Sequence, residues 1–389
     1  MNEIKSRIHG AIDTELPALI ELSEWLHAHP ELAWQEYNSA ARCARFLRDH
    51  GFEVEEHYVG LDTALHATFG SGSRRLALMA EYDALPGIGH ACGHNLIAAM
   101  SLGAAVGLST VANDLDLTVE VFGTPAEEGY GGKIEMLDRG AFEGLDFAMM
   151  AHPAPVDVAR AEPMAVAHWE VTFHGHAAHA ASYPTQGINA ADAFTISEVA
   201  LALLRQQLPP TVRVHGIITH GGDAPNAIPH FTRGRWYVRA STMQELEETQ
   251  ERVLRCFRAG ALATGCEVEI RDESQPYSDF RTDEPALAFY ENNARALGRD
   301  LRTEGPETQM CRASTDMANV SKVVRAIHPY IGVDCYPVLN HQAEFADACV
   351  GKVANQTLVD GATALAWTGA DVAGQWLDNK KTPLSSLYQ

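Results

Sequence analysis

Basic residues are scarce in this sequence: 29 lysines and arginines stand against 51 aspartates and glutamates, and the formal net charge is −22. A surface of this sign repels phosphate backbones and anionic lipids, so we expect no nucleic acid and no membrane as partners. No apolar run is long enough to span a bilayer, and no apolar signal core follows the first residues. Internal repeats and low-complexity segments are also absent, so a repeat protein is not indicated.

Disulfide-forming patterns are missing as well. The chain has seven cysteines, an odd number, and their spacings form no framework. We therefore expect a reduced, intracellular protein in the cytoplasm. With 389 residues, the chain is too long for one small core, so two domains are expected.

Apolar runs alternate with helical patterns in the first part of the chain, as in the β-α-β units of an open α/β sheet. Three of the expected strands are residues 76–80, 117–122 and 145–151. Such sheets bind ligands beyond the carboxyl ends of their strands. The metal- or proton-competent side chains that follow these strands are Asp83, Cys92, His94, Glu127, Glu128 and His152. We expect them to meet at one rim of the sheet.

Other elements of the α/β part follow from helical spacing and from helix stop signals. The expected helices are residues 3–28, 39–49, 95–108, 131–140, 284–297 and 351–368. The expected further strands are residues 52–59, 63–69 and 326–333. His341 follows the last of these strands, and residues 380–389 are expected to be loosely held.

The middle of the chain has a different texture, with a β-α-β-β-α-β order of expected elements. That order is typical of a small ferredoxin-like α+β sandwich. We therefore predict an inserted domain at residues 166–277, within an α/β domain formed by residues 1–165 and 278–389.

Two short motifs carry most of the chemistry. Cys92 and His94 are separated by one residue on an expected loop, and thiolate and imidazole are preferred ligands of zinc-like ions. Alone, the pair also fits a buried thiol near a surface histidine. Glu127 and Glu128 are adjacent, so they can point in different directions. One carboxylate can then bind a metal while the other takes a proton from water and delivers it to a leaving amine.

Six segments spread over nearly the whole chain together resemble those of a known family. These segments are Leu26-His27-Ala28-His29-Pro30-Glu31-Leu32, Asp83-Ala84-Leu85-Pro86, Cys92-Gly93-His94-Asn95, Pro125-Ala126-Glu127-Glu128-Gly129, Ser314-Thr315-Asp316 and His341. The sequence resembles the two-metal aminoacylase and glutamate-carboxypeptidase family. Within it, the nearest branch contains indole-acetyl-amino-acid hydrolases, aminobenzoyl-glutamate hydrolase and a β-alanyl-lysine dipeptidase. The resemblance implies a zinc-peptidase-like three-layer catalytic domain with the insertion as a lid and dimerisation domain.

The resemblance also implies roles for individual residues. Cys92 would bridge two divalent metal ions, and the remaining ligands would be His94, Glu128, His152 and His341. Glu127 would be the general base and acid, and Asp83 would hold an imidazole or thiolate in place. In the lid, His179 would stabilise the tetrahedral oxyanion and Asn226 would make a second contact. In several relatives these lid residues act across a dimer interface. His90 is expected to be structural.

Some positions depart from the common pattern of the branch. Asn95 replaces an aspartate, and Thr315 stands where many members have glutamate before Asp316. These variants favour the dipeptidase and aminobenzoyl-glutamate subgroup. Arg239 and Arg312 are candidates to hold a substrate carboxylate through a bidentate fork, although each can equally be a surface or strand arginine.

The leading hypothesis is a metal-dependent amidohydrolase for an N-acyl amino acid, dipeptide or aminobenzoyl-glutamate-like substrate. Zinc is the first choice of metal, with manganese, cobalt or nickel as alternatives, and a homodimer or higher homo-oligomer is expected through the lid. Three other interpretations stay open: an amidase with Cys92 as nucleophile, release of ammonia from an arylamine, and a silent metal-binding relative. The thiol amidase leaves Glu127 without a role, and an intact Glu127 argues against a silent protein.

Overall fold

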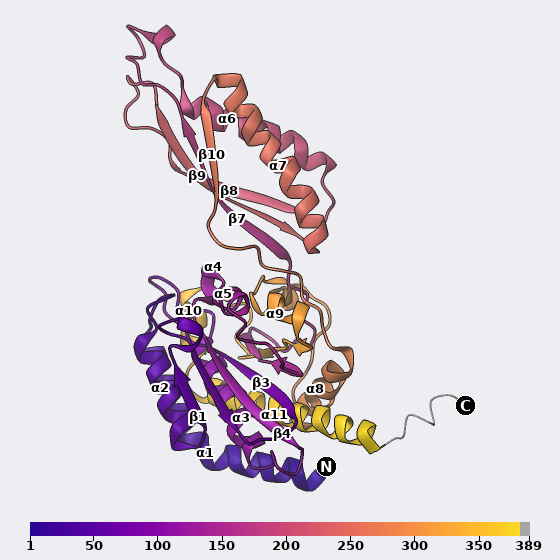
Figure 1. Cartoon of the computed structure of the whole chain (residues 1–389). Helices are drawn as coiled ribbons and strands as arrows, with labels where there is room; N and C mark the ends of the chain where they lie inside the picture. Colours follow the sequence, from indigo (N-terminus) through magenta and orange to yellow (C-terminus); the bar gives the residue numbers. More distant parts are fainter. Residues whose placement is uncertain (382–389) are drawn as a thin grey trace, which may run out of the picture. The chain divides into compact units, whose positions relative to one another are not determined.

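The computed structural model describes residues 1–381, which divide into two compact units. Unit 1 comprises Met1–Glu162 and Phe280–Gln389, and unit 2 comprises Pro163–Asp279. The domain limits expected from the sequence, 165/166 and 277/278, lie close to these positions. Each unit has its own sheet (Figure 1). Buried apolar side chains form a separate core in each unit.

Unit 1 is built on a six-stranded mixed sheet of order β1-β2-β4-β3-β5-β11. The strands are β1 (Glu53–Glu56), β2 (Leu65–Phe69), β3 (Arg74–Glu81), β4 (Leu117–Thr124), β5 (Phe147–Met149) and β11 (Ala326–Ile327). From β4 to β11 neighbouring strands run parallel, whereas β1 and β2 form an antiparallel edge. The carboxyl ends of β3 and β4 therefore meet at the same rim of the sheet.

Helices cover both faces of this sheet, because the central strands are apolar on both sides. Leu76, Leu78 and Ala80 of β3 pack into one core, and the alternate residues Ala77 and Met79 pack into the other. The first core is shared with α1 (Asn2–Ala28), α3 (His94–Ser109), α8 (Glu284–Ala296) and α11 (Lys352–Lys381). The second is shared with α5 (Gly132–Asp138) and α9 (Met317–Val323).

Short elements complete unit 1. They are α2 (Tyr37–Asp49), η1 (Tyr58–Gly60), α4 (Glu127–Tyr130), η4 (Pro306–Arg312) and α10 (Ala343–Ala348). The closing helix α11 continues to Lys381, well past the expected end at residue 368. Of the tail expected to be loosely held, residues 382–389 lie outside the described residues. Within residues 1–381, no helix has the length and apolarity that crossing a bilayer would require.

Two strand predictions in unit 1 were wrong in a related way. The expected strand 326–333 is split into β11 and β12 (Tyr330–Gly332), and His152, expected at the end of a strand, instead begins β6 (His152–Ala154). β6 and β12 form a separate parallel pair. The break in the second segment falls at Pro329, which has no N–H to continue a ladder and whose carbonyl accepts the N–H of His152 at 2.9 Å.

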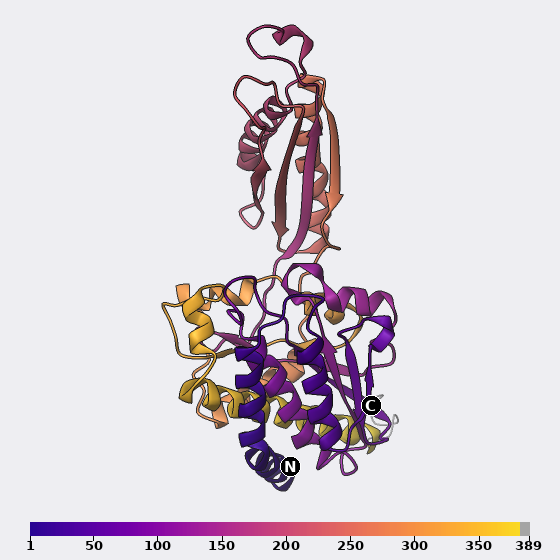
Figure 2. The same cartoon turned by 90° about the vertical axis from the view of Figure 1, so that its left-hand side faces the viewer.

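Unit 2 is a ferredoxin-like sandwich of one antiparallel sheet and two helices (Figure 2). Its strands are β7 (Ala165–His174), β8 (Arg213–His220), β9 (Phe231–Ala240) and β10 (Glu267–Asp272), in the order β10-β7-β9-β8. Helices α6 (Ala190–Leu204) and α7 (Met243–Thr264) cover one face, and short turns η2 (Pro184–Gln186) and η3 (Arg205–Gln207) flank α6. Aromatic packing fixes the core, with the Phe194 and Trp236 rings stacked at 5.1 Å.

Candidate active site

A tight turn places the Cys92-Gly93-His94 motif at the rim of the unit 1 sheet. Gly93 caps the start of α3 with φ +81°, in the left-handed region that glycine tolerates best. A Cβ atom at this position would lie 2.8 Å from the Pro153 ring, so a larger residue would strain the turn. The turn leaves Cys92 on the loop and His94 at the first position of the helix.

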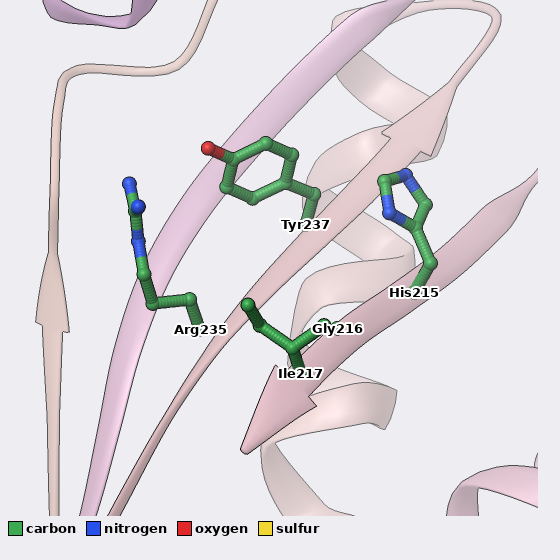
Figure 3. A pocket seen from close by; sticks show the side chains of 5 residues that line it. All are labelled: His215, Gly216, Ile217, Arg235 and Tyr237. Atoms are coloured by element: carbon green, nitrogen blue, oxygen red, sulfur yellow. The ribbon is translucent and has the colours of Figure 1, made fainter. Parts of the chain in front are cut away.

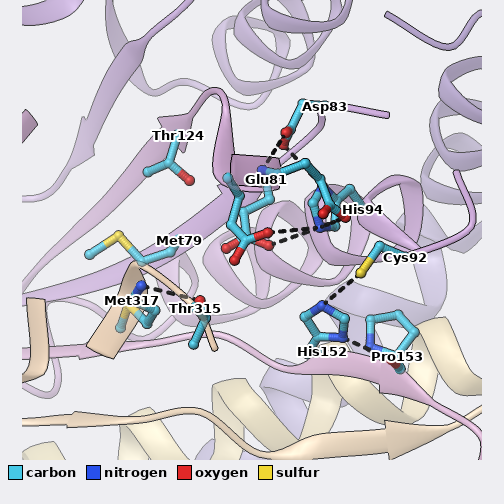
Figure 4. Close-up of polar contacts among 12 residues, drawn as sticks. Met79, Glu81, Asp83, Cys92, His94, Thr124, His152, Pro153, Thr315 and Met317 are labelled. Carbon is cyan, nitrogen blue, oxygen red and sulfur yellow. Dashed lines mark hydrogen bonds and ion pairs between the residues drawn. The ribbon is translucent and has the colours of Figure 1, made fainter. Parts of the chain in front are cut away.

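The Cys92 thiol is the centre of a cluster of potential ligands. Its Sγ lies 3.5 Å from His152 Nε2 and 3.5 Å from His341 Nε2, and Figure 4 shows the His152 contact. Two groups of ligand atoms, each within 4.8 Å of one another, share this thiol: Cys92–His94–His152 and Cys92–Glu128–His341. One sulfur is thus placed to serve two ions.

Backbone contacts bring the distant His341 to this cluster. Its N–H donates to the Ala91 carbonyl at 2.8 Å, directly beside Cys92. His341 has φ +67°, an uncommon conformation for a residue with a side chain. The neighbouring Asn340 side chain donates to the Pro153 carbonyl at 3.1 Å, which ties this loop to β6.

Asp83 orients two of the clustered groups. Its Oδ1 lies 3.0 Å from His94 Nδ1, and its Oδ2 accepts the backbone N–H of Glu128 at 3.0 Å. A histidine that donates from Nδ1 presents its Nε2 lone pair to a ligand. His152 is arranged in the same way, since its Nδ1 lies 2.8 Å from the Pro153 carbonyl.

Glu127 and Glu128 occupy α4, a four-residue turn with irregular backbone. Ala126 before it and Gly129 within it have φ of 56° and 94°. Glu128 Oε1 lies 3.6 Å from His341 Nε2 and 3.8 Å from His94 Nε2, and Glu127 Oε2 lies 3.9 Å from His94 Nε2. Glu128 falls in one ligand group with Cys92 and His341, and Glu127 falls in another with Glu81 and His94. Their separate tasks remain a prediction.

The protonation of the cluster reflects its burial. Burial, together with the neighbouring carboxylates Glu128 and Glu127, raises the pKa of the Cys92 thiol well above its ordinary value. Burial also raises the pKa of Glu127 and of Glu128, and it lowers the pKa of His152 to about 3. His94 differs from His152: burial alone would lower the pKa of its ring, but the Asp83 and Glu81 carboxylates raise that pKa well above the ordinary value. A metal ion at this point would take the place of the His94 proton and would hold the Cys92 thiolate.

Three buried charged residues beside the cluster had no role assigned from the sequence. Glu81 lies at the end of β3, and Lys133 of α5 donates to its carboxylate at 2.5 Å. Lys133 also donates to Asp316, just before α9, at 2.7 Å. The sequence did offer one signal for Glu81, because it is an acidic residue at the end of an apolar strand, two positions before Asp83. His90, expected to be structural, is buried and belongs to no ligand group among residues 1–381.

In unit 2, His179 and Asn226 lie on neighbouring loops. An isolated bridge pairs His179 with Ala227, and the Ala180 N–H donates to the Asn226 carbonyl at 2.9 Å. Both side chains are solvent-accessible. His179 Nδ1 accepts the N–H groups of Ala181 and Ser182 at 3.3 and 3.1 Å, so a neutral ring carries its proton on Nε2. That nitrogen can therefore donate a hydrogen bond.

The two candidate carboxylate-binding arginines lie in different units. Arg312 is exposed at the end of η4 in unit 1. Arg239, on β9 of unit 2, has its guanidinium 6.0 Å from the Tyr237 ring centroid and its Nε 3.4 Å from His215 Nε2. Tyr237 and His215 also line a cavity of about 280 Å³ on the β8–β9 surface (Figure 3).

Comparison with known proteins identifies the family. The model of peptidase family M20/M25/M40 matches residues 77–355, which is more than half of the chain. The chain belongs to this family. It is 39% identical to the Xaa-Arg dipeptidase of Mus musculus over 386 residues, covering 95% of this chain and 89% of that protein. It is 31% identical to one subunit of the p-aminobenzoyl-glutamate hydrolase of Escherichia coli, covering 74% of this chain and 64% of that one.

Solved structures agree on the fold. The aminobenzoyl-glutamate utilization protein from Klebsiella pneumoniae matches with a TM-score of 0.71 at 18% identity, covering 93% of this chain and 98% of that one. A dinuclear metal-binding M20 peptidase from Bacillus subtilis matches with a TM-score of 0.64 at 21% identity, covering 90% and 98%. The expected fold class is therefore confirmed, and family membership confirms a metal-dependent hydrolase of amide bonds.

Proposed function

We propose that the cluster around Cys92 holds two divalent ions and that the chain uses them to hydrolyse a dipeptide or a related N-acyl amino acid. The shared thiol carries this proposal: Cys92, His94 and His152 would hold one ion, and Cys92, Glu128 and His341 the other. Thiolate, imidazole and carboxylate together suit zinc first, with manganese, cobalt or nickel as alternatives. Bound there, the ions would lower the pKa of a water molecule and polarise the amide carbonyl.

The donor set fits such ions on a further observation. Three buried ligand atoms have no hydrogen-bond partner among the residues that the structure describes: Glu81 Oε2, His94 Nε2 and Glu128 Oε1. Leaving polar atoms buried and unpaired destabilises a fold, so a cation at this point would stabilise it. Asp83 supports the same geometry by fixing both the His94 ring and the Glu128 backbone.

Glu127 is proposed as the proton carrier. Its burial raises its pKa, which favours a carboxylate that takes a proton readily and gives it up to the leaving amine. In unit 2, His179 is proposed to donate from Nε2 to the developing oxyanion, and Asn226 to assist it. Arg239 and Arg312 are proposed to hold a substrate carboxylate.

For the substrate, the similarity to the Xaa-Arg dipeptidases supports dipeptides with a basic C-terminal residue as first candidates, because the alignment with those enzymes covers 95% of this chain. The aminobenzoyl-glutamate hydrolase subunit supports aryl-glutamate amides as the second candidate.

Assembly and location are proposed on separate grounds. β8 is an edge strand of unit 2 with exposed Ile217 and Ile218, which supports pairing with a second copy. The seven cysteines are free thiols, and six of them are buried, which supports a reducing, cytoplasmic setting.

Against the alternatives, the raised pKa of Cys92 opposes a free thiolate nucleophile. The test is a panel of dipeptides ending in Arg or Lys, aminobenzoyl-glutamate, N-acyl amino acids and arylamines, each assayed with and without chelator. We expect dipeptide cleavage that a chelator abolishes and added zinc restores. Activity that is indifferent to the chelator would refute the metal site, and release of ammonia alone would refute amide cleavage.

A further inference from the structure

Glu81 is fixed from one side by a chain of buried charges. Its Oε1 accepts from Lys133 Nζ at 2.5 Å, and the same Nζ donates to Asp316 at 2.7 Å. The Lys133 backbone N–H donates to the other Asp316 oxygen at 2.8 Å. All three side chains have 0% exposure. The carboxylate of Glu81 is therefore held by residues from α5 and from the start of α9.

The other oxygen of Glu81 points toward His94, as Figure 4 shows. Oε2 lies 3.4 Å from His94 Nε2, and neither atom has a hydrogen-bond partner among the described residues. His94 Nδ1 lies 3.0 Å from the Asp83 carboxylate and donates there, so Nε2 is the ring atom left to face Oε2. A contact this close between two buried acceptor atoms needs a cation between them, which is either a proton on Nε2 or a metal ion.

The separation suits a shared metal ion. Zinc binds imidazole nitrogen and carboxylate oxygen at about 2.1 Å, so two tetrahedral ligands lie roughly 3.4 Å apart. Glu81 and His94 also lie in a third group of atoms within 4.8 Å of one another, and its other member is the proposed proton carrier Glu127. We propose that Glu81 is an additional metal ligand, and that its Oε2 coordinates the same ion as His94 Nε2. This inference rests on the two-ion site proposed above.

Lys133 then acts as a positioning residue. By binding Oε1, it leaves Oε2 as the only oxygen of Glu81 directed at His94. The competing arrangement is a proton on His94 Nε2, which would give an imidazolium between Asp83 and Glu81 and no metal contact for Glu81. The two arrangements differ in the distance from Glu81 Oε2 to the bound ion.

The first experiment uses the unaltered protein loaded with zinc. Anomalous scattering from crystals locates the ions, and we expect one of them about 2.0–2.2 Å from Glu81 Oε2. Two bound ions, both more than about 3 Å from Glu81, would overturn this inference while leaving the proposed function intact. Failure of the protein to bind any ion would overturn both.

The second experiment compares Glu81→Gln with Glu120→Gln. Glu120 is a matched control, because its side chain has 0% exposure on β4 and is bound to Arg75 and His66, outside all the ligand groups found in residues 1–381. Zinc affinities are measured by competition with a chelating dye. We expect one of the two zinc equivalents to bind more weakly in Glu81→Gln by more than the ~10–100-fold that is typical of residues that only orient a ligand. Parent affinity for both equivalents in this variant would contradict the proposal.

Discussion

Unit 1 buries its functional charges, whereas unit 2 keeps its candidate functional side chains nearer the surface. Glu81, Lys133, Asp316 and His94 have no solvent exposure, and their partners come from several elements of unit 1. In unit 2, His179 and Asn226 are solvent-accessible on loops. Buried charges are fixed in place at the cost of desolvation, while loop residues at the surface can move. The charges of unit 1 are therefore held in fixed positions by their partners, whereas the candidate residues of unit 2 have no comparable buried network around them in the described part of the chain.

The largest effect should come from Glu127 within unit 1. Glu127→Gln cannot accept a proton, so turnover should fall by about 10²–10⁴-fold while metal content stays at the parent level. Glu128→Gln should instead weaken metal binding, because Glu128 shares a ligand group with Cys92 and His341. Metal content and single-turnover rates are measured on the two variants side by side. If Glu127→Gln loses metal, or turns over at the parent rate, the roles of the two glutamates are misassigned.

The next effect concerns unit 2. His179→Ala should lower kcat by about 10²–10³-fold, because a donor to the oxyanion acts in the transition state, and it should leave metal content unchanged. His174→Ala, an exposed histidine on β7, is the matched control. Steady-state kinetics measure kcat and KM separately for each variant. A change confined to KM would show that His179 only binds substrate, and loss of metal would place it in the ion site.

The smallest effect is on stability, and it again distinguishes the units. Glu36 in unit 1 accepts from Thr63 Oγ1 at 2.9 Å and from the Ala126 N–H at 2.8 Å, and burial, with Asp83 nearby, raises its pKa to about 7. The folded pKa lies above the unfolded value, so this contribution to stability is complete below about pH 4.5 and is lost as the pH rises through 7. Through this group the parent should lose about 3 kcal/mol of stability between about pH 4.5 and pH 8, and Glu36→Gln should not show that loss.

Urea unfolding of the metal-free protein at several pH values measures this difference. Glu267→Gln, at an exposed position on β10 of unit 2, is the control and should follow the parent. Parallel pH profiles for the parent and Glu36→Gln would show that Glu36 does not carry the pH dependence.

Sequence patterns predicted the local parts of this protein better than the distant contacts. β3, β4 and α3 follow from apolar runs, and the ferredoxin-like order of unit 2 follows from its alternation of elements. His341 was linked to Cys92 only through the family resemblance, because the two residues meet across a sequence separation of 249 positions. Glu81 was missed since its environment depends on Lys133, 52 positions away, which in turn depends on Asp316, a further 183 positions along.

The strand errors have a physical cause as well. Residues 326–333 are apolar enough for one strand, but Pro329 interrupts the ladder, so the chain pairs first with β5 and then with β6. His152 thereby enters the site from the beginning of a strand instead of the end of one.

The central claim is that one thiol, Cys92, serves two ions. The most direct measurement is the zinc content of Cys92→Ala after dialysis against a weak chelator, with Cys43→Ala as the control because Cys43 is also buried but lies in a different core position of unit 1. We predict two zinc ions per chain in the parent and in Cys43→Ala, and loss of both in Cys92→Ala. Retention of two ions by a folded Cys92→Ala would contradict it.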